Sequence, residues 1–259
     1  MTANPRSIEI EIEVPGTSEE VWQAIATGPG VSSWYVPHEI EEYEGGAAIA
    51  SFGPEPEMQA HGTVAAWDPP RRLVIDSGEG GPGLAFEWLV EAKDGGTCVV
   101  RLVNSGFGDG DEWDAQYDAM AEGWKMFLTG LRLHLEYFAP KPASAVLPMA
   151  MWPADQVDSW STLTGALGIP AEPEAGERIT VTGAGAPELS GVVVQSTPHR
   201  LSLLIDAPAA GTGFIAAEGH GDQSAVSIWY YLYGDDREAI ATRDDPRWRQ
   251  WLEQVAPAM

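Results

Sequence analysis

The longest helical pattern in the chain lies between residues 106 and 138. Apolar residues recur there every three or four positions, which places them on one face of a helix. They are Trp113, Tyr117, Met120, Trp124, Phe127, Leu131, Leu135 and Phe138. A face with so many large side chains has to be covered. The pattern therefore predicts a long helix that either fills a protein core or covers a cavity above a sheet.

Strand patterns precede this helix. Residues 7–14 alternate isoleucine or valine with glutamate, which is typical of a strand with one buried face. A short helix is expected after Thr17 or Ser18, with a second helical turn near residues 31–35. Further strands are expected at 47–52, 61–67, 73–77, 84–91 and 97–104. The short connections between them favour hairpins and thus an α+β domain, in which an antiparallel sheet wraps the long helix.

The alternation also predicts which side chains of the last two strands are buried. On 84–91, one face carries Leu84, Phe86, Trp88 and Val90. On 97–104, Arg101 is expected to face solvent, so Cys98, Val100 and Leu102 are expected to point inward. Both inner faces would then meet the long helix.

The second half of the chain repeats the first. Pro140, Pro142 and Pro148 end the helical pattern, so residues of about 139–145 are expected to form a linker. The motif PRRL at Pro70 returns as PHRL at Pro198, and 198 minus 70 gives the same offset, 128, as 214 minus 86 for the two phenylalanines. The repeat indicates two tandem domains, at 1–140 and 145–259.

The second copy differs from the first at its end. Asp245 followed by Pro246 is typical of a helix start, and Trp248, Trp251, Leu252 and Val255 follow before Pro257. A helix of about three turns is expected there, too short to cover what the first long helix covers. The second domain is therefore predicted to be a degenerate copy.

Composition excludes several classes of function. Fourteen Lys and Arg against 39 Asp and Glu give a formal charge of −25, which repels nucleic acid and anionic membrane surfaces. The single Cys98 cannot form an internal disulfide. The N-terminus lacks the apolar core of a signal peptide, and no stretch reaches the roughly 18 apolar residues of a membrane span. A soluble cytoplasmic protein is expected.

Three sequence patterns could suggest a binding site, but a structural role explains each of them better. Residues 78–83 fit GxGxxG, but a strand pattern follows where a dinucleotide site needs a helix, so a hairpin loop is expected. The acidic residues 109–114 lack the glycine and final glutamate of a calcium loop and suit a helix N-terminus. The histidines show no metal spacing. No metal site, cofactor or catalytic residue is assigned.

Three motifs carry a family resemblance. They are PGTSEEVWQAIATGPGVSSWYVP from Pro15, HGTVAAWDPPRRLVIDS from His61 and EGWKMFLTGLRLHLE from Glu122. With them the first half resembles the START-like (SRPBCC) superfamily, and within it the bacterial form of the family named after the activator of heat-shock protein 90 ATPase. The second half resembles it more weakly, through LSGVVVQSTPHRLSLLID. The resemblance implies two helix-grip domains in tandem, each a curved antiparallel sheet with a C-terminal helix.

The resemblance also implies a range of functions, because relatives bind lipids or polyketides, cyclise polyketides or stimulate a chaperone. Our leading hypothesis is that the first domain binds a hydrophobic small molecule between its long helix and its sheet, without covalent catalysis. Ordinary core packing is the alternative for the same side chains. The candidate residues are Trp34, His61, Phe86, Trp88, Tyr117, Met120, Trp124 and Phe127.

Two rival functions remain open from the sequence. A polyketide-cyclase-like enzyme would use His61 or Tyr117 to move protons. A co-chaperone that stimulates heat-shock protein 90 ATPase would act through its surface. Gly123 and Gly130, inside the long helix, suggest close approach of its backbone to the sheet or to a ligand.

Overall fold

The chain forms two compact units, Met1–Pro142 and Ala143–Met259. The structure is a computed structural model that describes residues 6–53, 55–77, 83–108 and 111–257, without the side chains of 111–116, 119 and 220. The division falls within the stretch 139–145 for which the prolines predict a linker. The predicted glycine loop, except Gly83, and the side chains of the acidic stretch 109–114 lie outside the described residues, as does the Trp113 side chain.

The first unit is built on a seven-stranded antiparallel sheet with the order β1-β7-β6-β5-β4-β3-β2. Its strands are β1 Arg6–Pro15, β2 His38–Ile40, β3 Ala47–Ser51, β4 Gln59–Asp68, β5 Arg72–Asp76, β6 Ala85–Lys93 and β7 Thr97–Phe107. Its helices are α1 Ser18–Ala26, α2 Gly28–Val31 and α3 Asp111–Tyr137, with a 3-10 turn at Pro56–Met58. The predicted strands and long helix are confirmed. Strand β2 was not predicted, and α2 begins earlier than expected.

Side-chain contacts explain where helix α1 begins and which face of the sheet is exposed to solvent. Thr17 caps α1: its Oγ1 accepts from Glu20 N at 3.2 Å, and its backbone N donates to Glu20 Oε2 at 2.8 Å. This capping box confirms the predicted helix start. On the outer face of the sheet, Arg101 pairs with Glu11 at 2.6 Å, as its predicted exposure requires.

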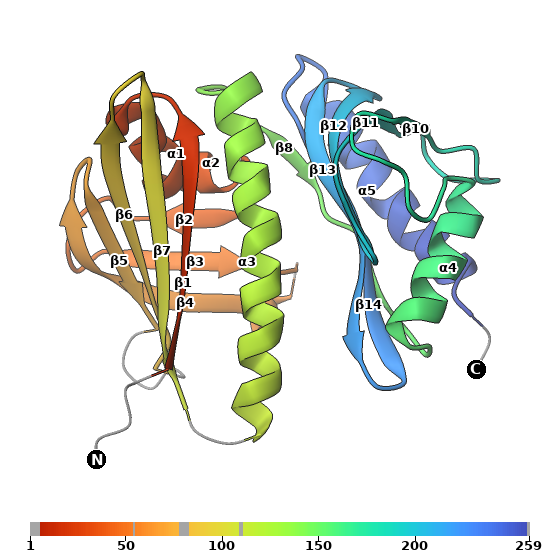
Figure 1. Ribbon diagram of the computed structural model, residues 1–259, viewed down its shortest axis with the longest axis horizontal. Coiled ribbons are helices and arrows are strands. Elements are labelled where there is room, and N and C mark those ends of the chain that lie inside the picture. The colour runs from red at the N-terminus through yellow and green to blue at the C-terminus, as the bar shows by residue number, and fades with distance from the viewer. Residues whose placement is uncertain (1–5, 54, 78–82, 109–110, 258–259) are drawn as a thin grey trace. The chain divides into compact units, whose positions relative to one another are not determined.

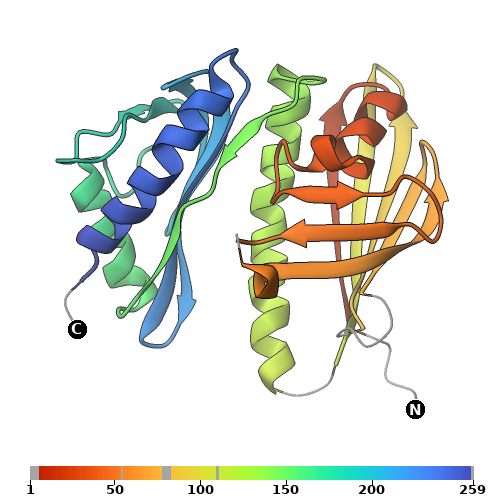
Figure 2. The same ribbon diagram turned by 180° about the vertical axis from the view of Figure 1, so that it is seen from behind.

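One face of the first sheet, here called the inner face, carries all three helices. Trp22 of α1, Val31 of α2 and Leu128 of α3 belong to a single core cluster with inner-face residues of the strands. Figures 1 and 2 show α3 running along the sheet, with α1 and α2 near the end where α3 finishes. Cys98, Val100 and Leu102 are all buried in this core, as the alternation predicts.

The second unit has the same plan. Its sheet has the order β10-β11-β12-β13-β14-β8, and β9 also pairs with β14. The strands are β8 Ser144–Val146, β9 Met149–Trp152, β10 Arg178–Thr180, β11 Ser190–Thr197, β12 Arg200–Ala207, β13 Gly211–His220 and β14 Gln223–Leu232. Two helices, α4 Gln156–Leu167 and α5 Arg237–Gln254, share one core cluster with the sheet. The fold is therefore α+β, with two helix-grip domains in tandem.

The last helix corrects one prediction. Helix α5 begins at Arg237 and has 18 residues, with Pro246 inside it, so it spans about five turns rather than three. Asp245 does not cap it, because its Oδ1 accepts instead from Leu147 N at 2.9 Å. Pro246 is tolerated because it is exposed, so the carbonyl that loses its helical partner can reach water. The helix is still shorter than α3, which has 27 residues.

The strand repeat also needs a correction of one or two residues. Ile215 and Ala217 belong to the core of the second unit, so Phe214, at the alternate position, points to the opposite face of β13. In the first unit Phe86 pairs with Ile75, and in the second Gly213 pairs with Leu203, the counterpart of Ile75. Gly213 therefore takes the place of Phe86. The common offset of 128 holds for β5, but the inner face of β6 is offset by 127 and that of β7 by 126, because Gly213 pairs with Tyr230 as Phe86 pairs with Asn104.

Candidate functional site

Six of the eight predicted site residues come together between α3 and the inner face of the first sheet. They are Trp34, Phe86, Trp88, Met120, Trp124 and Phe127. Trp124 of α3 lies at the centre of this aromatic cluster. Its ring centroid is 5.6 Å from that of Trp88 and 5.8 Å from that of Phe86, both on β6, and both contacts are edge to face. Trp34 reaches Trp88 from the other side, at 5.9 Å.

Burial changes across the aromatic cluster. Trp34 and Trp124 are closed off, with exposed fractions of 1% and 6%. Phe86, Met120 and Phe127 are only half-buried, although they pack against the same core. The cluster therefore extends from a dry interior to apolar side chains that water reaches.

Tyr35 and Phe52 extend the cluster to the surface, and sequence reasoning missed both. The Tyr35 ring centroid lies 4.4 Å from that of Phe127 and 5.1 Å from that of Trp124. Phe52, which is 44% exposed, contacts the far side of Tyr35 at 6.2 Å. Burial raises the pKa of the Tyr35 hydroxyl well above its ordinary value, so Tyr35 is neutral at physiological pH.

The backbone supports this arrangement at one of the two helix glycines. A Cβ on Gly130 would lie 3.4 Å from the carbonyl oxygen of Trp34, so α3 passes close to the turn that holds Trp34. Trp34 is fixed from its other side, where its Nε1 donates to Ala24 O at 2.9 Å. Gly123 differs, since a Cβ there would meet only the edge of Phe127 at 4.0 Å. The predicted close approach applies to Gly130 alone.

A buried amide lies beside the aromatic cluster. Asn104 of β7 is 0% exposed and sits in a row of inner-face residues formed by Ile8, Asn104, Phe86, Ile75 and Val64 on neighbouring strands. Its Nδ2 lies 3.7 Å from the sulfur of Met120, and its Oδ1 has no hydrogen-bond partner among the described residues. The sequence contained the signal, because Asn104 continues the inward positions 98, 100 and 102.

Tyr117 lies at one end of the site. Its ring packs against Phe107 at 5.1 Å and belongs with Ile8 and Leu84 to a small separate cluster, which shares Met120 with the main core. The guanidinium of Arg6 lies 4.7 Å from the ring centroid. The hydroxyl donates to Ser7 O at 3.1 Å. Tyr117 therefore adjoins the aromatic cluster with its hydroxyl directed to the backbone of β1.

His61 is separated from the other predicted residues. It is exposed on β4, where it pairs with Ile49, whereas the adjacent Gly62 pairs with Ala48 of the core. Because neighbouring residues of a strand point to opposite faces, His61 lies on the outer face of the sheet. The structure thus brings six predicted residues together, places Tyr117 beside them and leaves His61 apart.

Two other histidines of the first unit are shielded from water, His134 almost completely and His38 in part. The Nδ1 of His38 donates to Val36 O at 2.7 Å, and its ring lies 5.5 Å from that of Tyr35. Burial lowers its pKa, against the opposing effect of this hydrogen bond. Burial also lowers the pKa of His134 on α3, to about 4. Both are therefore neutral near pH 7.

The described part of the chain was compared with the requirements of a metal site and of a membrane-spanning helix. No three His, Cys, Asp or Glu side chains there gather in a way that could hold a metal ion. Within the same ranges, no helix has the length and apolar character that a membrane crossing requires. Cys98 is buried, with its sulfur 3.4 Å from Gly16 O.

Three solved structures are among those similar to this chain. The di-domain ARO/CYC BexL from the BE-7585A biosynthetic pathway is 15% identical, with a TM-score of 0.46 over 96% of this chain and 93% of that one. DynU16, a putative protein of the dynemicin biosynthetic locus, is 17% identical, with a TM-score of 0.44 over 96% and 95%. CalU16 from Micromonospora echinospora is 23% identical, with a TM-score of 0.41 over 51% of this chain and 78% of that one.

Sequence comparison assigns a family to the first unit. No curated protein sequence matches the chain. Residues 16–136 match the model of the family described as "Activator of Hsp90 ATPase homolog 1-like protein". The matched stretch begins just before α1 and ends in the last turn of α3, so it contains every residue of the aromatic cluster. The first unit, over residues 16–136, therefore resembles the Activator of Hsp90 ATPase homolog 1-like family, as its three sequence motifs indicate.

Proposed function

We propose that the first unit binds a hydrophobic small molecule between α3 and the inner face of its sheet, without covalent catalysis. One observation carries the proposal: Phe86, Met120 and Phe127 face the helix–sheet interior and yet retain surface that water reaches. Apolar side chains in an interior are normally closed off, because each buried square ångström contributes about 25 cal/mol. A ligand that covers them would gain this contribution.

The arrangement of the aromatic rings supports the same proposal. Small-molecule sites are lined mainly by apolar and aromatic side chains with a few polar groups among them. Phe86, Trp124 and Tyr35 lie in successive contact, and Phe52 continues the series to the surface. An apolar molecule entering beside Phe52 would meet aromatic faces and edges along its whole path. The formal charge of −25 favours a neutral or cationic ligand over an anionic one.

The two rival functions draw less support from the geometry. The cyclase-like alternative needs a proton-transfer group beside the ligand, whereas His61 lies on the outer face and the Tyr117 hydroxyl donates to Ser7 O. The co-chaperone alternative stays a prediction. Purified protein that stimulates heat-shock protein 90 ATPase, with the effect unchanged in an aromatic-cluster variant, would favour it over ligand binding.

Titration with Nile red, a neutral fluorescent probe of apolar sites, tests the proposal. We expect saturable binding of one probe per chain in the wild type. Phe127→Ala should weaken it about tenfold, the effect of losing about 1.4 kcal/mol of ring contact. Circular dichroism verifies that the variant is folded.

The control for this titration is Met151→Ala, which removes a 62% exposed side chain of the second unit. It should bind Nile red like the wild type. The absence of saturable binding in the wild type, or equal losses in both variants, would contradict the proposed site.

A further inference from the structure

The buried Asn104 gives the proposed site a polar feature that the aromatic cluster lacks. Its cross-strand neighbours on the inner face are Ile8 of β1 and Phe86 of β6. Phe86 in turn contacts Trp124 of α3 at 5.8 Å. The amide is therefore enclosed by apolar side chains and lies next to the rings that would hold a hydrophobic molecule.

The hydrogen bonding of Asn104 is incomplete. Its Nδ2 lies 3.7 Å from the Met120 sulfur, which is a weak acceptor, and its Oδ1 has no partner among the described residues. The great majority of buried side-chain polar atoms in proteins have a hydrogen-bond partner, so such an atom needs an explanation. The second unit shows that the fold itself does not require an amide here. Tyr230, which pairs with Gly213 as Asn104 pairs with Phe86, takes this place in the second unit, and its hydroxyl accepts from Trp248 Nε1.

We propose that Asn104 Oδ1 accepts a hydrogen bond from an O–H or N–H group of the bound molecule. The ligand class is then a hydrophobic molecule with a hydrogen-bond donor at the end that enters deepest. This inference rests on the proposed function, because it concerns the same site. It adds a polar specificity residue to a site otherwise lined by apolar and aromatic side chains.

Met120 explains how a ligand reaches the amide. Its side chain is half-buried, and its sulfur lies beside Asn104 on the α3 side. Methionine is unbranched and flexible, so it can change rotamer at small cost. A donor group that displaces the thioether replaces a weak contact with a conventional hydrogen bond. The apolar part of the molecule then lies against Phe86 and Trp124.

Three probes of similar size separate the polar contact from apolar binding. They are 2-naphthol, which carries an O–H donor, 2-methoxynaphthalene, whose oxygen only accepts, and 2-methylnaphthalene, which has no polar atom. Titrations of ¹⁵N-labelled full-length protein, followed by NMR, give the three dissociation constants. In the wild type, 2-naphthol should bind about tenfold more tightly than the other two. The side-chain amide resonances of Asn104 should shift with 2-naphthol and not with 2-methylnaphthalene.

Asn104→Leu, which replaces the amide with an apolar side chain, should abolish the preference for 2-naphthol and retain binding of 2-methylnaphthalene. The matched control is Gln59→Leu, the same kind of exchange at an exposed position of β4. It should keep the tenfold preference.

The outcomes distinguish the two proposals. Equal binding of all three probes in the wild type overturns the role of Asn104 and leaves hydrophobic binding intact. A preference that persists in Asn104→Leu also overturns that role. No binding of any probe overturns the proposed function and, with it, this inference. The comparison within the wild type decides the matter even if Asn104→Leu does not fold.

Discussion

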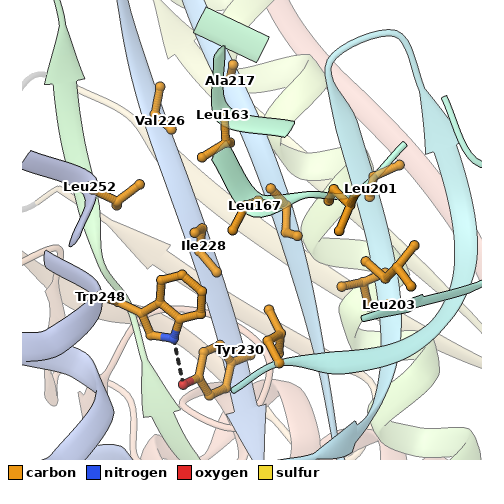
Figure 3. Packing of buried hydrophobic residues seen from close by; sticks show 14 of the residues in the cluster. Leu163, Leu167, Leu201, Leu203, Ala217, Val226, Ile228, Tyr230, Trp248 and Leu252 are labelled. Carbon is orange, nitrogen blue, oxygen red and sulfur yellow. Dashed lines mark hydrogen bonds between the residues drawn. The ribbon is translucent and has the colours of Figure 1, made fainter. Parts of the chain in front are cut away.

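In the second unit, α5 closes its sheet completely at the centre of contact. Trp248 is 0% exposed, and its Nε1 donates to the Tyr230 hydroxyl at 3.1 Å (Figure 3). In the first unit, α3 presents Trp124 to the sheet in the corresponding way, but the side chains around it remain half-buried. The same plan of a helix on an antiparallel sheet thus gives one closed interior and one that water still reaches.

Two substitutions at equivalent inner-face positions account for much of this difference. Where the first unit has Phe86, the second has Gly213, and where the first has Asn104, the second has Tyr230. At these positions the second unit has no side chain on β13, and the polar group of Tyr230 on β14 is paired with Trp248. The comparison assigns the proposed hydrophobic binding to the first copy and makes the second copy a natural reference for a closed core.

The largest expected effect on stability is a difference between alanine substitutions at the two central tryptophans, Trp248 and Trp124. Trp248→Ala should lower the free energy of unfolding by about 5 kcal/mol, because it leaves a cavity and deprives the Tyr230 hydroxyl of its donor. Trp124→Ala should cost less, about 3 kcal/mol, since its neighbours already reach water. Urea unfolding measures both. Equal losses would show that the first interior is as closed as the second.

Acidification should affect the two helices differently. Burial lowers the pKa of His134 from 6.5 to about 4. Between pH 6.5 and pH 4 this histidine is therefore protonated in the unfolded chain but neutral in the folded unit. Stability is therefore complete above pH 6.5 and should fall by up to about 3 kcal/mol as the pH drops to 4. Helix α5 contains no histidine and cannot contribute this loss.

Unfolding free energies of His134→Gln measured across this pH range test the point. The variant should lose most of the acid sensitivity that His134 contributes, whereas His61→Gln, at an exposed position, should retain the wild-type curve. A His134→Gln curve identical to the wild type would contradict the assignment.

Asn104→Leu should leave the first interior without an unpaired amide. Removing an acceptor without a partner and adding a buried leucine should raise the free energy of unfolding by about 1–2 kcal/mol. In the second unit, Leu232→Asn should destabilise the protein, because it buries an amide in an apolar core. Thermal unfolding measures both. A loss of stability in Asn104→Leu would mean that the amide has a partner in the free protein.

The smallest effects concern glycines inside helices. Gly123→Ala on α3 and Gly165→Ala on α4 should each stabilise the protein by about 1 kcal/mol, because alanine favours the helix and both sites have room for a Cβ. Gly130→Ala should gain little, since its Cβ would press on the Trp34 carbonyl. Chemical denaturation distinguishes them. A full gain at Gly130 would show that α3 is not held tightly there.

Much of the fold could be predicted because each strand and helix carries its own periodicity. The alternation on β1 and β7 and the stripe on α3 depend only on which face is buried. The misplaced phenylalanine on β13 shows where this fails. The hairpin between β13 and β14 pairs His220 with Gln223, whereas the hairpin between β6 and β7 pairs Lys93 with Thr97. The two hairpin turns therefore differ in length by one residue, which changes the pairing register of the strands, and a comparison of the two sequences at a constant offset does not reveal this.

The candidate site was predictable in part for the same reason. Trp34, Trp88 and Trp124 could be expected inside because large aromatic residues are seldom left in water. The orientation of Tyr35 depends on the turn after α2, which no periodic pattern describes. Asn104 lay on the predicted inner face, but its missing hydrogen bond depends on which atoms of α3 come near it. Such a feature exists only in three dimensions.

The half-buried part of the aromatic cluster has a consequence for heat capacity. Unfolding raises the heat capacity of a protein in proportion to the apolar surface that it newly exposes to water. Phe86, Met120 and Phe127 already touch water in the folded first unit, so this unit should contribute less per residue than the second. A molecule that covers them would bind with a negative heat-capacity change. In the first unit, the ligand would then complete the hydrophobic core that the polypeptide leaves open.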